Sequence, residues 1–388
     1  MKWMGAILQD KDAEEWTYRG EGALNLVLAY CGSSPHFVQF SLSYNYARSS
    51  EVGKVLRIQK VRNDRPECEN GHSALVNHES LLWGKFEGIV SAPTREVAEH
   101  IYVQKVMCPL LGSEHVDAGI HVLVSREFLE AVDNKVLCQR PSWRVDAARI
   151  NPLHDSVLLI SDHSVFPHFS DSLREDFCVS VEIKISQISQ YHPLDLFSGS
   201  KDGIQKAIEA LFLTPQNNFR VFLNGSIIFG GMGGTADSTS STAAQSFHDG
   251  LKHVISAKDG MHIKGFVDLL TETIFKSGLL NRLLEVQKLD AIDIEGAIHS
   301  YYDIISQPCV VCRQIGGEKF AARYSSIHSM LRDDKVRIVR DYLISATAKD
   351  LSMMISFKSK INMDEESLHR AVFLESSKQT FYYKVDTN

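Results

Sequence analysis

The sequence predicts an α+β protein of two lobes, and three observations point to this class. Strand-like runs lie mostly in the first half of the 388-residue chain, whereas helical periodicity dominates the second half. Near the N-terminus, a glycine-containing turn separates two strand-like runs. The chain is long enough for two bodies with cores of their own, which we place at residues 1–163 and 164–388.

The first half follows from local patterns, taken in chain order. Residues 16–60 are expected to form strand, turn and strand, and the Asn-, Asp-, Pro- and Glu-rich residues 62–78 a loop. A helix is expected over residues 94–106 with Thr94 as its N-cap, because apolar residues recur there at helical spacing. Short apolar runs follow, and they suit buried strands.

The second half begins with an alternating segment over residues 178–185. Val181 and Ile183 should lie on one face of this strand, and Glu182 and Lys184 on the other. The remaining expected elements are helices over 202–213, 262–305 and 335–349, strands over 219–225 and 351–357, and a Gly/Ser/Thr-rich loop over 230–242.

Composition excludes several classes of function. The net charge of −7 disfavours nonspecific binding to nucleic acid or to a membrane surface, so a polyanionic substrate would need a local cationic pocket. No apolar run approaches a membrane span, and charge interrupts the N-terminus too early for a signal peptide. Seven scattered cysteines indicate reduced thiols. We expect a monomer in the cytoplasm or nucleus that is not secreted.

The glycine turn is the first candidate site. It reads Arg-Gly-Glu-Gly at residues 19–22, and the backbone of such a loop can come close to phosphate oxygens. The strand over residues 54–60 is expected to carry cations on one face. A glycine loop with a strand-borne cation is the phosphate-handling layout of kinases. An ordinary hairpin turn accounts for the same residues, and this pattern alone does not separate the two.

A second candidate is a metal site around Cys309-Val-Val-Cys312. His299 lies ten residues before this motif and His328 sixteen residues after it. Two thiolates and two imidazoles suit a closed, four-coordinate structural zinc, which would serve folding and not chemistry. A redox pair of cysteines, or ordinary buried helix histidines, would also account for these residues.

Two further clusters are weaker. Gln-Asn-Asn-Phe-Arg at residues 216–220 places two amides and a guanidinium at a strand entrance, which suits phosphates or hydroxyls but also an Asn-built turn. Asp350 lies between a helix and a strand, where kinases hold a carboxylate against the reacting hydroxyl. An ordinary helix-terminal aspartate has the same appearance.

Together these segments resemble the inositol-pentakisphosphate 2-kinase family, and its plant members most of all. The matching stretches are residues 16–22, 54–60, 109–112, 116–119, 140–144, 161–164, 181–184, 193–200, 214–225, 293–312 and 346–357. The resemblance covers most of the chain and implies transfer of the ATP γ-phosphate to the 2-hydroxyl of inositol 1,3,4,5,6-pentakisphosphate, giving inositol hexakisphosphate (phytate). It also implies a two-lobed, kinase-like fold, ATP and Mg²⁺ as cofactors, and a structural Zn²⁺ in the C-lobe.

The resemblance assigns roles to matching positions. For the nucleotide, these are Arg19, Gly20, Glu21 and Gly22 in the loop, Arg57 and Arg220 on ATP phosphates, Asp162 and His163 at the adenine hinge, and Glu182 nearby. Substrate or nucleotide phosphates would be bound by Arg62, Arg144, Lys184 and Asn217. Asp350 would be the catalytic base, with Lys184 beside it in the reaction. The zinc ligands would be His299, Cys309, Cys312 and His328.

The chain also departs from the family pattern. After Lys184 it continues Ile-Ser-Gln, without the Pro-Lys and the basic segment that the family carries there. It stops at Asn388, before the family's metal-binding Asp and its substrate-binding Lys, Arg and Tyr, and Ala23 replaces a glycine. These departures predict impaired catalysis.

Two other classes of function stay open on the sequence. One is a catalytically inactive protein that binds nucleotide or inositol phosphate, or a zinc-stabilised interaction module. The other is a zinc-ribbon nucleic-acid binder, against which the acidic balance of the chain argues. Turnover of the inositol phosphate separates the kinase from both of them.

Overall fold

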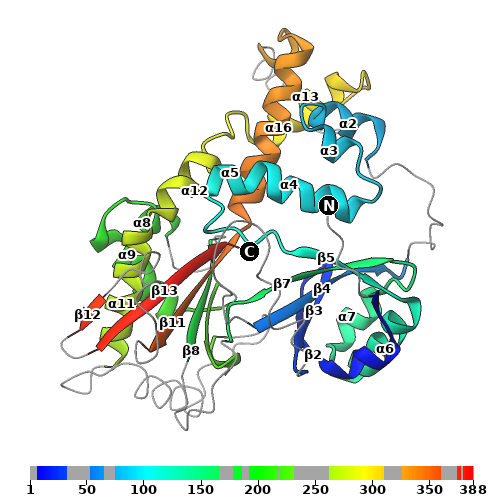
Figure 1. Cartoon of the computed structure of the whole chain (residues 1–388). Helices are drawn as coiled ribbons and strands as arrows, with labels where there is room; N and C mark the ends of the chain where they lie inside the picture. Colours follow the sequence, from blue (N-terminus) through cyan, green and yellow to red (C-terminus); the bar gives the residue numbers. More distant parts are fainter. Residues whose placement is uncertain are drawn as a thin grey trace.

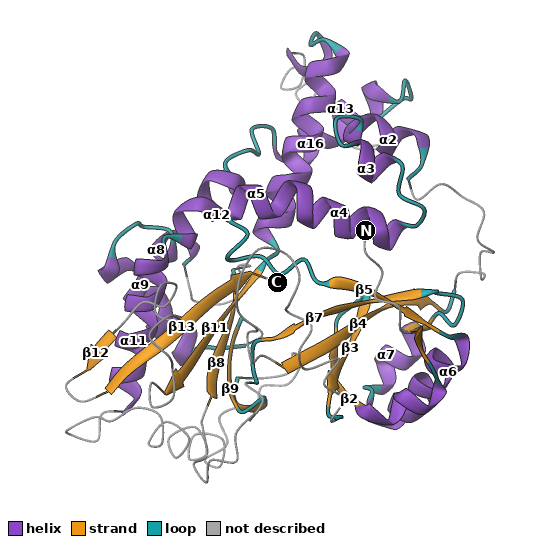
Figure 2. Cartoon of the chain, in the orientation of Figure 1, coloured by secondary structure: helices purple, strands orange, loops and turns teal. Residues whose placement is uncertain are grey.

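The computed structural model describes residues 7–32, 53–64, 75–165, 178–185, 192–216, 218–230, 262–309, 326–359, 374–376 and 379–387. These residues form two β-sheets with helices around them, so the predicted α+β class is confirmed. Figure 1 shows the two sheets next to each other, with α4 and α5 running above them (Figure 1). Figure 2 shows that the other helices gather in groups against or above the two sheets (Figure 2).

The first sheet has seven strands. Six follow the order β1-β5-β7-β4-β3-β2, and β6 pairs with β4. The strands are β1 (Ile7–Leu8), β2 (Trp16–Glu21), β3 (Asn25–Tyr30), β4 (Gly53–Arg62), β5 (Ile120–Val124), β6 (Ala148–Ile150) and β7 (Ser156–Asp162). The helices beside them are η1 (Asp10–Glu15), α6 (Arg126–Val136), η3 (Leu137–Gln139) and α7 (Ser142–Ala147). Trp16, Leu56 and Phe128 are fully buried in the core of this sheet. The strand, turn and strand expected over residues 16–60 are present, but the region holds three strands, β2, β3 and β4.

The second sheet has six strands in the order β10-β9-β8-β11-β13-β12. The strands are β8 (Cys178–Lys184), β9 (Phe219–Leu223), β10 (Ser226–Phe229), β11 (Ser352–Ser359), β12 (Leu374–Ser376) and β13 (Gln379–Thr387), and the helices against them are α8 (Pro193–Leu196), α9 (Lys201–Leu213) and α11 (His262–Ser277). Val181 and Ile183 are buried while Glu182 and Lys184 are half-buried on the other face, as the alternation of β8 predicts.

A third group of helices brings distant parts of the chain together. It comprises α2 (Asn77–Trp83), α3 (Glu87–Val90), α4 (Arg95–Tyr102), the π-helical η2 (Val103–Met107), α5 (Cys108–Leu111), α12 (Leu279–Gln287), α13 (Asp293–Ile304) and α16 (Arg332–Lys349). Leu82 of α2 packs with Ile304 and Val339 in one buried cluster. The loop expected over residues 62–78 is therefore too long, because α2 begins at Asn77.

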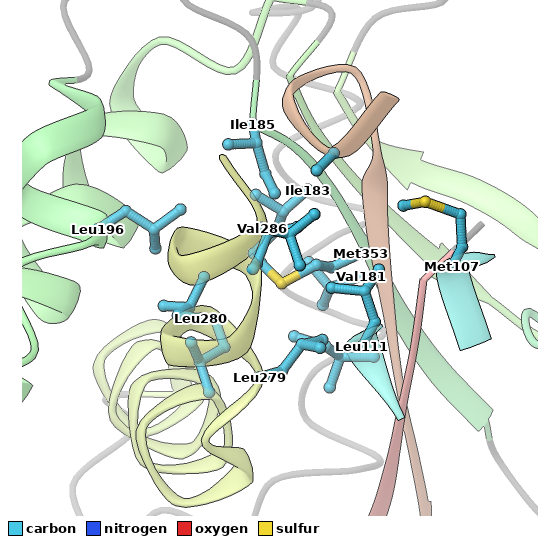
Figure 3. Close-up of a cluster of buried hydrophobic side chains, with 14 of the residues drawn as sticks. Met107, Leu111, Val181, Ile183, Ile185, Leu196, Leu279, Leu280, Val286 and Met353 are labelled. Atoms are coloured by element: carbon cyan, nitrogen blue, oxygen red, sulfur yellow. The ribbon is translucent and has the colours of Figure 1, made fainter. Parts of the chain in front are cut away.

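The largest core joins this helix group to the second sheet. Figure 3 shows Leu111 and Leu279 close to Val181 of β8, with Met353 of β11 beside them (Figure 3). Met107 of η2 belongs to the same core. Apolar side chains of residues 75–111 are thus buried with the second sheet, although they precede the predicted boundary at residue 163. The division into residues 1–163 and 164–388 stays a prediction, and the packing of this core does not follow it.

Capping side chains explain where two of the predicted helices begin. The Thr94 hydroxyl accepts a hydrogen bond from the Val97 amide at 3.3 Å, so α4 begins at the expected cap. In α9 the cap is Ser200, whose hydroxyl accepts from the Gly203 amide at 3.1 Å, and Asp202 lies inside the first turn. An acidic residue in that position favours the helix through its dipole.

Candidate active site

Arg19 lies in a β-bulge just before the glycine turn. The register between β2 and β3 shifts between Tyr18 and Gly20, so Arg19 is an extra residue on β2. Its guanidinium Nη2 donates to the Ser164 hydroxyl at 2.6 Å, and its Cζ lies 5.5 Å from the centre of the Phe222 ring. Arg19 therefore links the first sheet to the chain between the sheets and to β9. Its role in binding ATP stays a prediction.

Glu21, which the resemblance places in the nucleotide loop, is buried in the protein. Its side chain is 1% exposed, and so are those of Lys60 and Arg140. Arg140 Nε donates to Glu21 Oε1 at 2.9 Å, while Arg140 Nη2, at 3.1 Å, and Lys60 Nζ both donate to Oε2. Burial alone raises the pKa of the Glu21 carboxyl, but these hydrogen bonds outweigh it and hold the pKa below its usual value. We call Glu21, Lys60 and Arg140 the buried ion cluster.

Strand β4 carries cations on both of its faces, which corrects the expectation of a single cationic face. Lys60 shares the buried face of Leu56 and Ile58, because side chains two residues apart point the same way. Arg57 lies on the opposite, exposed face. With its carboxamide oxygen turned toward Arg57, Asn25 accepts hydrogen bonds from Nε at 3.1 Å and from Nη2 at 2.8 Å. Arg57 therefore lies beside the glycine turn, where a phosphate-binding cation is expected.

The chain leaves the first sheet through the hinge segment, residues 161–165, which includes the predicted adenine-binding pair. Asp162 and His163 are both buried, with exposed fractions of 8% and 5%. The Asp162 Oδ1 accepts a hydrogen bond from the Ser164 amide at 2.9 Å. The His163 carbonyl accepts from the Ser180 hydroxyl of β8 at 2.8 Å. The hinge segment is thereby attached to the second sheet as well as the first.

Asp117, in the segment just before β5, supports the hinge segment. Its Oδ2 accepts from the Ser161 amide at 2.8 Å, and its Oδ1 accepts from the Gly119 amide at 2.9 Å. Burial by itself raises the pKa of this carboxyl, but the two backbone hydrogen bonds and nearby His163 outweigh burial and hold the pKa below 3.8. The charged form of Asp117 is therefore favoured in the folded protein.

We expect Asp117 to make stability depend on pH in acid. Because its folded pKa lies below the unfolded value near 3.8, its contribution is present above that pH and is lost as the pH falls through the folded pKa. Asp117→Asn should lower the urea midpoint at pH 6, since its amide nitrogen would face a backbone N–H, and should flatten the dependence below pH 4. Urea unfolding of both proteins from pH 6 to pH 3 measures this, and parallel curves would contradict it.

The second sheet brings four predicted residues to one region. Glu182 of β8 pairs with Arg220 of β9 in register, and its Oε2 accepts from Arg220 Nη1 at 3.1 Å. Lys184 lies two residues further on the same face of β8 and is in register with Ser352 of β11. Asp350 is exposed and ends α16 two residues before Ser352. A carboxylate, a lysine and a paired arginine are thus gathered on neighbouring elements.

Two of the remaining predicted phosphate ligands belong to the first sheet and the helices beside it. Arg62 ends β4 and forms an exposed ion pair with Asp64 at 2.7 Å. Arg144 lies in α7 with its Cζ 4.0 Å from the centre of the Trp143 ring, which is exposed. Asn217 falls outside the described residues.

Of the predicted zinc ligands, the structure brings the two histidines together. The rings of His299 and His328 are edge to face with centres 5.8 Å apart, and His299 is 2% exposed. His328 Nδ1 lies 2.8 Å from Asp303 Oδ2. Cys309 is a free thiol, and Cys312 lies outside the described residues. Within the described part of the chain, no group of three or more His, Cys, Asp or Glu side chains is placed to hold a metal.

Sequence reasoning missed three residues that hold the site together: Lys60, Arg140 and Asp117. The signal for Lys60 was present, because it shares the period-two face of Leu56 and Ile58. Arg140 and Asp117 fall in stretches that resemble the family, but no local pattern indicates which groups they contact.

Comparison with known proteins identifies the family. The profile of the family described as inositol-pentakisphosphate 2-kinase matches residues 18–184 and 180–387. The chain is 46% identical to inositol-pentakisphosphate 2-kinase of Arabidopsis thaliana, over 98% of this chain and 89% of that protein. It is 42% identical to the kinase of Oryza sativa subsp. japonica over the same shares, and 23% identical to that of Danio rerio over 97% and 89%.

Two findings complete the description. In the described part of the chain, no helix is long and apolar enough to cross a membrane. The profile match takes in nearly the whole chain, including the glycine turn, the hinge segment, β8 and Asp350. The chain therefore belongs to the inositol-pentakisphosphate 2-kinase family.

Proposed function

We propose that this protein transfers the γ-phosphoryl group of ATP to the 2-hydroxyl of inositol 1,3,4,5,6-pentakisphosphate, giving inositol hexakisphosphate. The observation that carries the proposal is the placement of Lys184 and the Glu182–Arg220 pair on neighbouring strands of the second sheet, with Asp350 at the end of α16 two residues before β11. Family membership supplies the reaction, and it also supports a two-lobed, kinase-like architecture with the nucleotide bound between the lobes.

The proposed roles follow the chemistry of each group. Asp350 accepts the proton of the 2-hydroxyl as general base, and its exposed position at the end of α16 leaves it accessible to substrate. Lys184 and Arg220 neutralise phosphate charge beside it, and Arg57 does so from β4. Bound Mg²⁺ would neutralise charge on the transferring phosphate, and the Glu182 carboxylate is an oxygen donor of the type it prefers.

The remaining residues bind and orient the two substrates. The hinge segment with Asp162 and His163 accommodates adenine, while Arg62, Arg144 and Asn217 bind phosphates. A substrate with five phosphates needs such convergent cations, because the net charge of the chain, −7, repels it.

We further propose that turnover is slower than in the Arabidopsis relative. The alignment with that relative spans 422 residues, more than the 388 of this chain, so the relative has residues within the matched region that this chain lacks. The profile match breaks into two parts that overlap at residues 180–184. The break lies at the end of β8, where the resemblance implies that family members carry a basic segment, and loss of phosphate-binding cations slows phosphoryl transfer.

The test is a kinase assay with ATP, Mg²⁺ and inositol 1,3,4,5,6-pentakisphosphate, with products separated by anion exchange and the Arabidopsis kinase alongside. We expect hexakisphosphate at a rate below that of the relative. A rate equal to the relative's would refute the slower turnover. Binding of both ligands by calorimetry without any product would refute the kinase and favour an inactive binding protein.

We also propose that His299, Cys309, Cys312 and His328 hold a structural zinc ion. The two imidazoles are adjacent, and Asp303 beside His328 Nδ1 leaves Nε2 of that ring for a metal, a common outer-shell arrangement. With two thiolates the set is closed, so zinc would stabilise the fold around α13 and take no part in the reaction.

Removing this zinc should destabilise the protein. We expect one zinc per chain by elemental analysis, and a fall in Tm of about 10 °C or more on chelation, because several kcal/mol of binding free energy are lost and about 1 kcal/mol shifts Tm by about 2–4 °C. Cys309→Ser should lose the zinc, whereas Cys138→Ser, at an exposed free thiol, should keep it. If the purified protein contains no zinc and its Tm does not change on chelation, the proposed zinc site is refuted.

A further inference from the structure

The buried ion cluster is the most deeply buried group of charges among the described ion pairs. The side chains of Glu21, Lys60 and Arg140 are each 1% exposed. Two cations meet one carboxylate there, and Asp133 Oδ1 lies 3.7 Å from Arg140 Nη1 as a second anion. Charges removed from water at this depth carry a large desolvation cost, which apolar side chains of similar volume would avoid. Stability alone therefore does not account for the cluster.

The cluster holds the glycine turn from inside. Lys60 Nζ donates to the Gly22 carbonyl at 2.9 Å as well as to Glu21. The Lys60 backbone amide donates to the Leu24 carbonyl at 2.7 Å, so one residue of β4 contacts both sides of the turn. Gly22 has no side chain, so its backbone is held by this lysine at the carbonyl and by the Asn25 carbonyl, 2.8 Å away, at the amide.

The same carboxylate holds the segment that carries Arg144. Arg140 Nη2 donates to the Ala148 carbonyl at 2.7 Å and lies 3.4 Å from the Arg144 carbonyl, besides its bonds to Glu21. Helix α7 lies between Arg140 and Ala148 and is only six residues long. One guanidinium therefore joins the middle of this short helix and the residue just after its end to Glu21 at the base of the glycine turn.

We propose that Lys60 and Arg140 are positioning residues that couple the glycine turn to Arg144. The nucleotide and the inositol phosphate are thereby held in a fixed position relative to each other. The inference rests on the proposed function for the identity of the two ligands. Both residues act through Glu21 and through backbone carbonyls, and neither reaches a ligand, since their side chains are closed off from solvent. Coupling of this kind is reciprocal, so disturbing one side weakens binding on the other.

The test measures both affinities in folded variants by calorimetry, with a nonhydrolysable ATP analogue (adenylyl imidodiphosphate) and with inositol pentakisphosphate. Arg140→Lys, on the substrate side, should weaken the ATP analogue about fivefold or more, and Glu21→Gln, in the turn, should weaken the pentakisphosphate by a similar factor. Arg126→Lys is the matched control, because Arg126 lies on α6 in an exposed ion pair with Glu130, away from the buried ion cluster. It should change neither affinity.

The cross-effects decide the question. The coupling is refuted if Arg140→Lys weakens binding of the pentakisphosphate alone and Glu21→Gln weakens binding of the ATP analogue alone. It is also refuted if neither variant changes either affinity, even where stability falls. If the single variants fail to fold, Glu21→Met combined with Lys60→Met and Arg140→Met supplies an uncharged interior of similar size. That triple variant should fold and bind both ligands more weakly, and unchanged affinities would refute the proposal. Because binding is measured without turnover, an inactive wild-type chain would refute the kinase function and leave this test intact.

Discussion

Asp350→Asn should lower kcat for hexakisphosphate formation by about 10²–10⁴-fold, the usual contribution of a general base. The carboxamide has the size of the carboxylate but accepts no proton at neutral pH. Helix α16 should end as before, because its last turn uses the Asp350 backbone amide, which donates to the Ala346 carbonyl at 3.2 Å. Single-turnover kinetics with saturating ATP and pentakisphosphate measures the chemical step, and calorimetry checks that both ligands still bind.

The matched control for Asp350 is Asp333→Asn, the same substitution at the exposed first turn of the same helix. Its kcat should stay close to that of the unchanged protein, because Asp333 lies at the opposite end of α16 from Asp350. A full rate in Asp350→Asn would place the base elsewhere. Equal losses in both variants would indicate an effect on the helix and not on proton transfer.

Glu21→Met should lower the free energy of unfolding by about 3–5 kcal/mol, because it leaves the charges of Lys60 and Arg140 buried without their partner. Chemical denaturation followed by tryptophan fluorescence measures the loss. The first sheet is expected to unfold first, and Trp16 lies in its core.

Two comparisons show whether the uncompensated charge is the cause. Replacing Lys60 and Arg140 by Met in the same protein should recover most of the stability, since the remaining carboxylate, Asp133, is one-third exposed to water. Glu130→Met, which breaks the exposed pair with Arg126, should cost less than about 1 kcal/mol. A loss below about 1 kcal/mol in Glu21→Met would contradict the cost of burying these cations.

The parts of the fold that sequence predicts well are those fixed by neighbours in the chain. The alternation of β8 assigns Val181 and Ile183 to the core because side chains two residues apart share a face. Thr94 marks the start of α4 because its hydroxyl reaches an amide three residues on. The same period-two rule separates Lys60, which lies on the face of Leu56 and Ile58, from Arg57 on the other face of β4.

The candidate site is less predictable because its contacts are distant in sequence. Arg140 meets Glu21 across 119 residues, and Arg19 meets Ser164 across 145. Local patterns indicate a glycine turn, but they do not show that its glutamate points inward to two cations. The roles of Arg57, Lys184 and Asp350 are implied by the resemblance. The structure adds which residues lie around them.

The shared core of the third helix group also bears on how the chain is made. Leu82 packs against Val339, which a ribosome adds roughly 250 residues later, about 10–50 s at about 5–20 residues per second. Until then Leu82 lacks this partner, whereas Met107 and Leu111 meet theirs earlier, when β8 and α12 are made. We therefore expect α2 to complete its packing late in synthesis, and its apolar side chains to be open to chaperones until then.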